Sequence, residues 1–322
     1  MKKIIHDEII QPKNQLYLYG YEDYFFNFEQ FYQRKRLPNA MLLSGQKGLG
    51  KSTFVYHFIN YLLSSKEKFT YDRRNFSIDH NNSTYKLIQD LTHPNLFILD
   101  AINEENIKIE KIRELIIFLN KSTYYKNIKL VIIDNAEHLN INSANALLKS
   151  IEEPSEDTYF FLINNNSKKI LSTIRSRCIE FNFNFSFNKK KNILNQLKKE
   201  YNFDFNDSDL ESFLNFDTHG NFIRYSFLLK ESKLKLSDDP LTCIDYFMDL
   251  YNSKNDLKIL NLSTLLIQKF YTKLALNNGL LINQYYKNLN KILYMINNMK
   301  KFNLDKKNLI FSINKIIHNE HR

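Results

Sequence analysis

The chain has 322 residues, of which 43% are hydrophobic and 14% aromatic, so it has enough apolar residues for two or three globular domains and is not a disordered polypeptide. Two cysteines, Cys178 and Cys243, exclude a disulfide framework and a four-cysteine zinc site, and no apolar run approaches the roughly 18 residues that span a bilayer. The net charge of +10 has two interpretations: contact with nucleic acid, or the lysine-rich bias of AT-rich coding DNA. We therefore expect a cytoplasmic protein without zinc or a membrane segment.

The first part of the chain, residues 1–182, alternates short apolar runs with amphipathic segments, which predicts a parallel α/β sheet. Apolar spacing predicts a helix over residues 107–120, and the polar stretch 64–93 is interpreted as an insertion or helix-loop. The predicted strands are Ala40–Ser44, Asn95–Leu99, Lys129–Asp134 and Tyr159–Asn164.

The second part of the chain is predicted to be helical from about residue 187. Residues 183–238 are interpreted as a small lid, with helices over 187–201 and 221–230 and a further helix cap at 207–209. After a polar break, residues 239–322 are predicted to form an all-helical domain. The Lys189–Lys191 run is interpreted as a solvated helix face, with DNA contact as the alternative.

A glycine cluster gives the clearest chemical signal, because three of the six glycines fall within residues 45–50. Gly45, Gly48 and Gly50 precede Lys51 and Ser52 in the spacing G-x-x-x-x-G-K-S, and Thr53 follows in the predicted helix. In such a phosphate-binding loop, backbone N–H groups and the lysine hold phosphates while the serine hydroxyl ligates Mg²⁺. The alternative is an ordinary glycine turn. The residues predict a site for ATP and Mg²⁺.

The predicted strand 129–134 ends in Asp134. We expect Asp134, together with Ser52, to hold the Mg²⁺ ion and its ligand shell. A helix cap is the alternative role for Asp134. The next residue is Asn135, which can orient a water but cannot take its proton, so we expect slow hydrolysis or none. Glu137 is a candidate to replace the base, but the backbone is expected to have turned away two residues further on.

Two further motifs follow, A-N-A-L-L-K-x-x-E-E-P over residues 144–154 and T-I-x-S-R-C over residues 173–178. The first is predicted to be a helix capped by Asn142 or Ser143 and ended by Pro154. With the glycine loop and Asp134, these motifs resemble the bacterial DNA polymerase III clamp loader, in the AAA+ superfamily, over about residues 16–182. The resemblance implies an α/β P-loop AAA+ domain with a parallel sheet (1–182), a small helical lid (183–238) and an all-helical C-terminal collar (239–322).

Within that family, the chain resembles the delta-prime subunits more than the gamma/tau motor subunits. Asp134-Asn135-Ala136-Glu137 replaces the D-E-x-H or D-E-A-D of a motor, and the chain has no tau-like tail. The segment His93-Pro94-Asn95-Leu96 is similar to the H-P-D-L of delta-prime chains of alphaproteobacterial type, with asparagine in place of aspartate.

The resemblance also implies roles for single residues. Arg177 would act in trans as an arginine finger on the ATP of a neighbouring subunit, with a structural ion pair as the alternative, and Arg175 is the less favoured finger. Asn164 or Asn165 would hold the polar sensor position near the γ-phosphate, with a turn-forming role as the alternative. Arg224 would bring the lid to the nucleotide, although the usual G-x-x-R spacing is longer by one residue. Cys178 is expected to be a small buried side chain and no nucleophile.

The implied function is that of a delta-prime subunit, which helps to load the sliding clamp on primed DNA. Its partners would be the gamma/tau and delta subunits, and the clamp, the polymerase core and primed DNA would be reached through the complex. An active gamma/tau-type ATPase is the main alternative. A nucleotide kinase is a third possible function, but the S-R-C motif has no role in such an enzyme.

Overall fold

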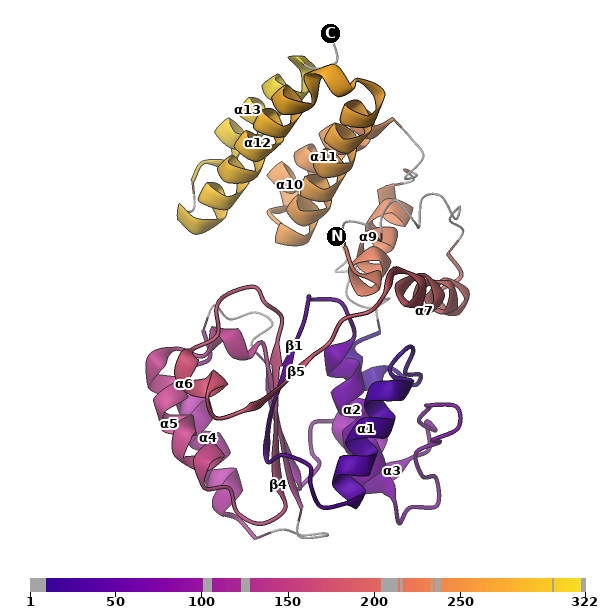
Figure 1. Ribbon diagram of the computed structural model, residues 1–322, viewed down its shortest axis with the longest axis vertical. Coiled ribbons are helices and arrows are strands. Elements are labelled where there is room, and N and C mark those ends of the chain that lie inside the picture. The colour runs from indigo at the N-terminus through magenta and orange to yellow at the C-terminus, as the bar shows by residue number, and fades with distance from the viewer. Residues whose placement is uncertain are drawn as a thin grey trace. The chain divides into compact units, whose positions relative to one another are not determined.

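A computed structural model describes residues 10–100, 106–122, 128–203, 214, 217–232, 234, 239–302 and 304–319 (Figure 1). The chain divides into two compact units. The first comprises Met1–Asn202 with Thr218–Asn221, and the second comprises Phe203–Asp217 with Phe222–Arg322.

The first unit is built on a five-stranded parallel sheet in the order β2-β3-β4-β1-β5. Its strands are β1 (Ala40–Ser44), β2 (Leu96–Asp100), β3 (Lys129–Asp134), β4 (Thr158–Asn164) and β5 (Ile179–Asn182). The four predicted strands are confirmed to within one residue. The sequence did not predict β5, because this short edge strand is not buried and lacks a continuous apolar run.

One face of the sheet is covered by α1 (Glu22–Gln33), α2 (Lys51–Ser64) and α3 (Ser83–Gln89), as Figure 1 shows. Aromatic rings fill this side: the Phe28 ring meets Phe54 at 5.1 Å between centroids, and Phe25 meets Phe58 at 5.6 Å. The short 3₁₀ helix Pro12–Asn14 precedes α1. The helix α3 lies in the stretch predicted as an insertion or helix-loop, and Asn82 caps it by accepting from the Tyr85 N–H.

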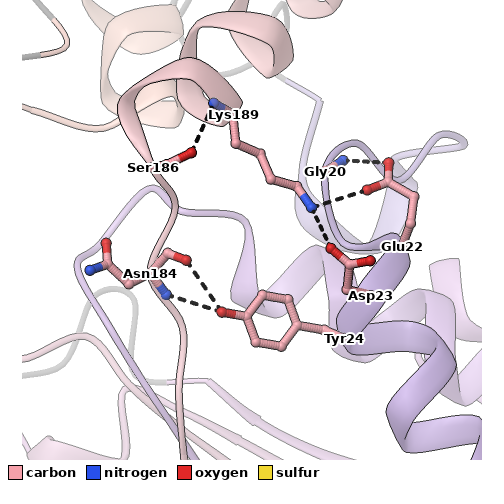
Figure 2. Close-up of polar contacts among 7 residues, drawn as sticks. All are labelled: Gly20, Glu22, Asp23, Tyr24, Asn184, Ser186 and Lys189. Atoms are coloured by element: carbon pink, nitrogen blue, oxygen red, sulfur yellow. Dashed lines mark hydrogen bonds and ion pairs between the residues drawn. The ribbon is translucent and has the colours of Figure 1, made fainter.

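The helix α7 (Phe187–Glu200) belongs to the first unit and is joined to the start of α1 (Figure 2). The Lys189 ammonium donates to Asp23 Oδ2 at 3.0 Å and lies 3.4 Å from Glu22 Oε2. Beside this pair, the Tyr24 hydroxyl donates to the Asn184 carbonyl at 3.3 Å. Lys189 is therefore bound to carboxylates of its own chain.

The opposite face of the sheet carries α4 (Ile109–Asn120), α5 (Ile141–Glu152) and the short α6 (Ser172–Arg175) (Figure 1). The buried stripe of α5 is Ala144, Leu147 and Ile151. The predicted cap at Asn142 or Ser143 is wrong: Asn140 caps α5, and its side chain accepts from the Ser143 N–H at 2.8 Å. Ser143 is instead buried in the first turn, where its hydroxyl donates to the Ile107 carbonyl at 2.6 Å.

The second unit is helical in its described part, as predicted. It contains α10 (Pro240–Lys254), α11 (Leu257–Asn277), α12 (Ile282–Phe302) and α13 (Lys306–Asn319), and most of α9 (His219–Ser232). The predicted cap at 207–209 and most of the polar break at 236–240 lie outside the described residues, and the three-domain division stays a prediction. Among the described residues, no helix is long and apolar enough to cross a membrane.

Candidate functional site: the phosphate loop and the arginine box

The glycine loop connects β1 to α2, and Lys51 is the first residue of α2. Only 2% of Lys51 is exposed. Its ammonium donates to the carbonyls of Gly45 at 2.8 Å and Gln46 at 2.9 Å, and to Asn165 Oδ1 at 2.8 Å. The three ammonium donors therefore point at three oxygens, the kind of acceptor that a phosphate would also offer.

Burial lowers the pKa of Lys51 to about 8, although the carboxylates of Asp134 and Glu137 favour its charged form. A phosphate anion beside the ammonium would favour the charged form further. The lysine side chain is thus a buried cation with little access to water. Such a cation is suited to bind a phosphate anion.

Ser52 and Asp134 meet at the end of β3, where the serine hydroxyl donates to Asp134 Oδ2 at 2.6 Å. Burial raises the pKa of Asp134, against the opposing effect of this hydrogen bond and of the Asn135 N–H, which donates to Oδ1 at 2.8 Å. One hydroxyl and one carboxylate side by side fit the shell of a Mg²⁺ ion that carries a nucleotide. When bound, Mg²⁺ would neutralise phosphate charge, with Ser52 and Asp134 as the residues that hold it.

The residues after Asp134 are engaged within the chain. The Glu137 carboxylate is buried and accepts from the Asn165 N–H at 3.1 Å and from the Ser167 hydroxyl at 2.7 Å. Asn135 has a left-handed backbone at φ 57°, and its side-chain oxygen accepts from Asn165 Nδ2 at 3.0 Å. Glu137 therefore secures the loop after β4, and its hydrogen bonds direct it away from the role of a base.

Residues 218–221 of the first unit cover the carbonyl side of the glycine loop. The Gly220 N–H donates to the Gly48 carbonyl at 3.0 Å, the Thr218 hydroxyl to the Lys47 carbonyl at 2.8 Å, and His219 Nε2 lies 3.1 Å from the Leu49 carbonyl. Gly48 has φ +89°, and a Cβ there would stand 2.3 Å from Thr218 Oγ1. These contacts use carbonyl oxygens of the loop, whereas phosphates bind the N–H groups of such loops.

The two candidate sensor residues have different partners. Asn165 reaches Lys51, as described, whereas Asn164 is 5% exposed and its amide donates to Ser44 Oγ at 3.1 Å. The Ser44 hydroxyl donates in turn to Glu180 Oε1 at 2.6 Å. Asn165, the alternative, is therefore the asparagine beside the ammonium, and the sensor role itself stays a prediction.

The T-I-R-S-R-C segment, which we call the arginine box (residues 173–178), comprises most of α6 and the three residues that connect it to β5. The Arg177 side chain is 36% exposed and forms an ion pair with Glu152, the last residue of α5. Arg177 Nη1 also donates to the Thr173 carbonyl at 3.1 Å. The guanidinium thus lies at the surface and has partners in its own chain.

Other predicted site residues are less informative. Burial raises the pKa of the Cys178 thiol to about 12, which fits a structural side chain and no nucleophile. Thr53 is half-buried in the first turn of α2. Arg224 belongs to the second unit, so its position over the nucleotide stays a prediction. Among the described residues, no three histidine, cysteine or acidic side chains gather as metal ligands.

Some contacts of the site were not foreseen from the sequence. The link from Ser44 to Glu180 and the contacts of residues 218–221 join segments far apart in the chain, and no local pattern marks such partners. Glu180 alternates with apolar residues in β5, and that short alternation was the one available signal.

A parallel sheet in the order β2-β3-β4-β1-β5, with a glycine loop after β1 and a carboxylate at the end of β3, defines a P-loop protein of the AAA+ class. Within this class, the sequence comparisons identify the family. A family model described as DNA polymerase III, delta subunit matches residues 21–186, just over half of the chain, and the chain belongs to this family, among relatives named as delta' subunits.

The DNA polymerase III subunit delta' of Buchnera aphidicola from Schizaphis graminum is 28% identical over 302 residues, covering 85% of this chain and 89% of the relative. The Pseudomonas aeruginosa subunit delta' is 33% identical over 148 residues, covering 46% of this chain and 43% of the relative. The Escherichia coli subunit delta' is 32% identical over 148 residues, covering 46% and 42%. The chain thus aligns with less than half the length of the last two relatives.

A solved structure of a gamma subunit-related protein from Thermotoga maritima aligns with 73% of this chain and 89% of its own, at a TM-score of 0.46 and 22% identity. The family assignment rests on the sequence matches.

Proposed function

We propose that this chain is the delta-prime subunit of a bacterial DNA polymerase III clamp loader and works in the cytoplasm. In this role it helps gamma/tau and delta subunits to load the sliding clamp on primed DNA, and it meets the polymerase core through the complex. Family membership supports the proposal. The observation that carries it is the contrast between a surface arginine box and a nucleotide loop without a base.

The nucleotide loop of this chain would bind ATP with Mg²⁺ and turn it over slowly or not at all. Lys51 would pair with phosphate charge, and Ser52 and Asp134 would hold the metal. Proton transfer from an attacking water requires a base, and Asn135 cannot accept a proton. Glu137 is buried and already accepts hydrogen bonds from Asn165 and Ser167. The loop therefore serves mainly as scaffold.

Arg177 would serve the nucleotide of the neighbouring motor subunit. A guanidinium is planar and permanently charged, so it can bind the charge that develops on a γ-phosphate. Its pairing with the exposed Glu152 costs little to exchange, because surface ion pairs contribute only about 0–1 kcal/mol.

A gamma-type motor ATPase is the second candidate. Lys51, Ser52 and Asp134 are all present, and the gamma subunit of Buchnera aphidicola from Schizaphis graminum is 26% identical over 286 residues. This candidate requires turnover at the chain's own loop, and Asn135 opposes that.

Affinity purification from the chain's own cells, with ATP and Mg²⁺ present, separates the two candidates. We expect one copy of this chain beside several motor subunits and a clamp-opening subunit, identified by mass spectrometry. Recovery as a homo-oligomer with its own ATPase activity would overturn the delta-prime proposal and favour the motor.

A further inference from the structure

Glu180 lies on β5 between the arginine box and the strand that leads into the nucleotide loop. Its Oε1 accepts from Ser44 Oγ at 2.6 Å. Its Oε2 accepts from two nitrogens of Arg175, Nε at 2.9 Å and Nη2 at 2.8 Å. The Glu180 side chain is 20% exposed, so this carboxylate is largely removed from water and each of its oxygens has a partner.

The Ser44 end of this connection is fixed by the sheet. Ser44 is the last residue of β1 and is buried, and its hydroxyl also accepts from Asn164 Nδ2 at 3.1 Å. The Ser44 carbonyl accepts from the Phe183 N–H at 2.8 Å, and the Gly45 N–H donates to the Asn164 carbonyl at 3.2 Å. Glu180 is therefore bound to Ser44, the residue that directly precedes the nucleotide loop.

The other end of the connection is the arginine box. Arg175 is the last residue of α6, and Arg177 follows two residues later. The Arg177 N–H donates to the carbonyl of Ile174 at 3.1 Å, and Ile174 is fully buried in the core. Arg175 is 61% exposed, so its ion pair adds little to stability and its main consequence is geometric.

We propose that Glu180 is a positioning residue for Arg177. By binding Arg175 and Ser44 at once, it holds α6 against the end of β1 and fixes the direction in which Arg177 leaves the surface. This inference rests on the proposed function, since it concerns how well Arg177 reaches the neighbouring nucleotide. Arg177 is the residue that meets the phosphate, and Glu180 acts through it.

Loss of the Glu180 contacts should slow the chemical step of ATP hydrolysis at the neighbouring site. Misplacing a catalytic group by about 1 Å can cost up to roughly 10²-fold in rate. Glu180→Gln keeps an acceptor for Ser44 and the size of the side chain, but it removes the charge that binds Arg175. We expect a loss of about 3- to 10-fold in kcat at the neighbouring site, with KM for ATP unchanged, because the change acts in the transition state.

The test uses the complex reconstituted with the motor and delta subunits of the same cells. The motor subunits carry alanine at their own arginine-box arginine, so that Arg177 supplies the remaining finger. Steady-state ATPase activity is measured for wild type, Glu180→Gln, Arg177→Ala and the double variant. Glu114→Gln is the matched control, because Glu114 pairs with Lys111 on the surface of α4, outside the arginine box.

The inference requires that Glu180→Gln lower kcat and that it cause no further loss once Arg177 is alanine. Unchanged kcat in Glu180→Gln, or an equal loss in the Arg177→Ala background, would overturn it. If Glu180→Gln fails to fold, Arg175→Gln replaces it, since this exposed residue leaves the Ser44–Glu180 bond in place. Activity that survives Arg177→Ala undiminished would instead overturn the proposed function.

Discussion

The nucleotide loop and the arginine box lie at the two ends of one hydrogen-bonded connection, yet they differ in nearly every physical respect. Lys51 of the loop is buried, Asp134 at the end of β3 is half-buried, and both have partners within the chain. Arg177 lies at the surface, and its partner Glu152 is itself exposed. Buried polar groups with partners in the chain contribute to its structure. An exposed cation whose partner can be exchanged is suited to bind a charged group of another molecule.

The largest effect on stability is expected in acid, because the first unit buries two histidines: His219 Nε2 lies 3.1 Å from the Leu49 carbonyl of the loop, and His57 Nε2 in α2 lies 3.0 Å from the Gln15 carbonyl. Burial lowers the pKa of His57 to about 3 and that of His219 to about 4. Both would titrate near 6.5 in the unfolded chain, which therefore binds more protons as the pH falls below 6.5. Stability should fall with pH in that window, by about 3 kcal/mol for each histidine at pH 4.

Urea unfolding of the full chain at pH 7, 5.5 and 4 tests this expectation. The variant His57→Gln should show a shallower loss of unfolding free energy with falling pH than the wild type. His80→Gln is the control, because His80 is exposed. Equal pH dependence in wild type and His57→Gln would contradict the expectation.

Substitution of one serine in each region compares the stability contributions of the nucleotide loop and the arginine box. Ser52→Ala removes the donor to the half-buried Asp134 carboxylate and should lower the free energy of unfolding by about 1.5–3 kcal/mol, the usual contribution of a hydrogen bond to a charged group. Ser176→Ala in the arginine box should change it by less than about 0.5 kcal/mol, because Ser176 is exposed. Equal losses in chemical denaturation would remove the contrast between the two regions.

The smallest effect is expected for the partner of Arg177. Glu152→Gln removes an exposed ion pair and should lower the free energy of unfolding by less than about 1 kcal/mol. Glu153→Gln is the matched control, since it makes the same change at the neighbouring exposed position. A loss above about 2 kcal/mol for Glu152→Gln alone would show that Arg177 is structural.

The sequence predicted the loop better than its connections. Glycine spacing and the apolar runs of β1, β3 and β4 are local signals, and they were sufficient to place Lys51, Ser52 and Asp134 together. The edge strand β5, and with it Glu180, could not be predicted, because its pairing with β1 depends on tertiary register. The choice between Asn164 and Asn165 was open for the same reason: adjacent residues of a strand end point to different partners.

The cap of α5 shows a different limit. Asn140, Asn142 and Ser143 are all good N-cap residues, so composition alone cannot select one. The structure selects Asn140, because Ser143 is buried and needs the Ile107 carbonyl as its partner.

The central claim is that this chain contributes a finger and not a motor, and one pair of variants tests it most directly. In the reconstituted complex whose motor subunits lack their own fingers, Arg177→Ala should lower ATPase activity by at least about 10²-fold, since such fingers are worth roughly 10³–10⁵ in rate. Lys51→Met, which disables the chain's own loop, should leave activity within about twofold of wild type. Loss of turnover in Lys51→Met, with Arg177→Ala active, would contradict the account.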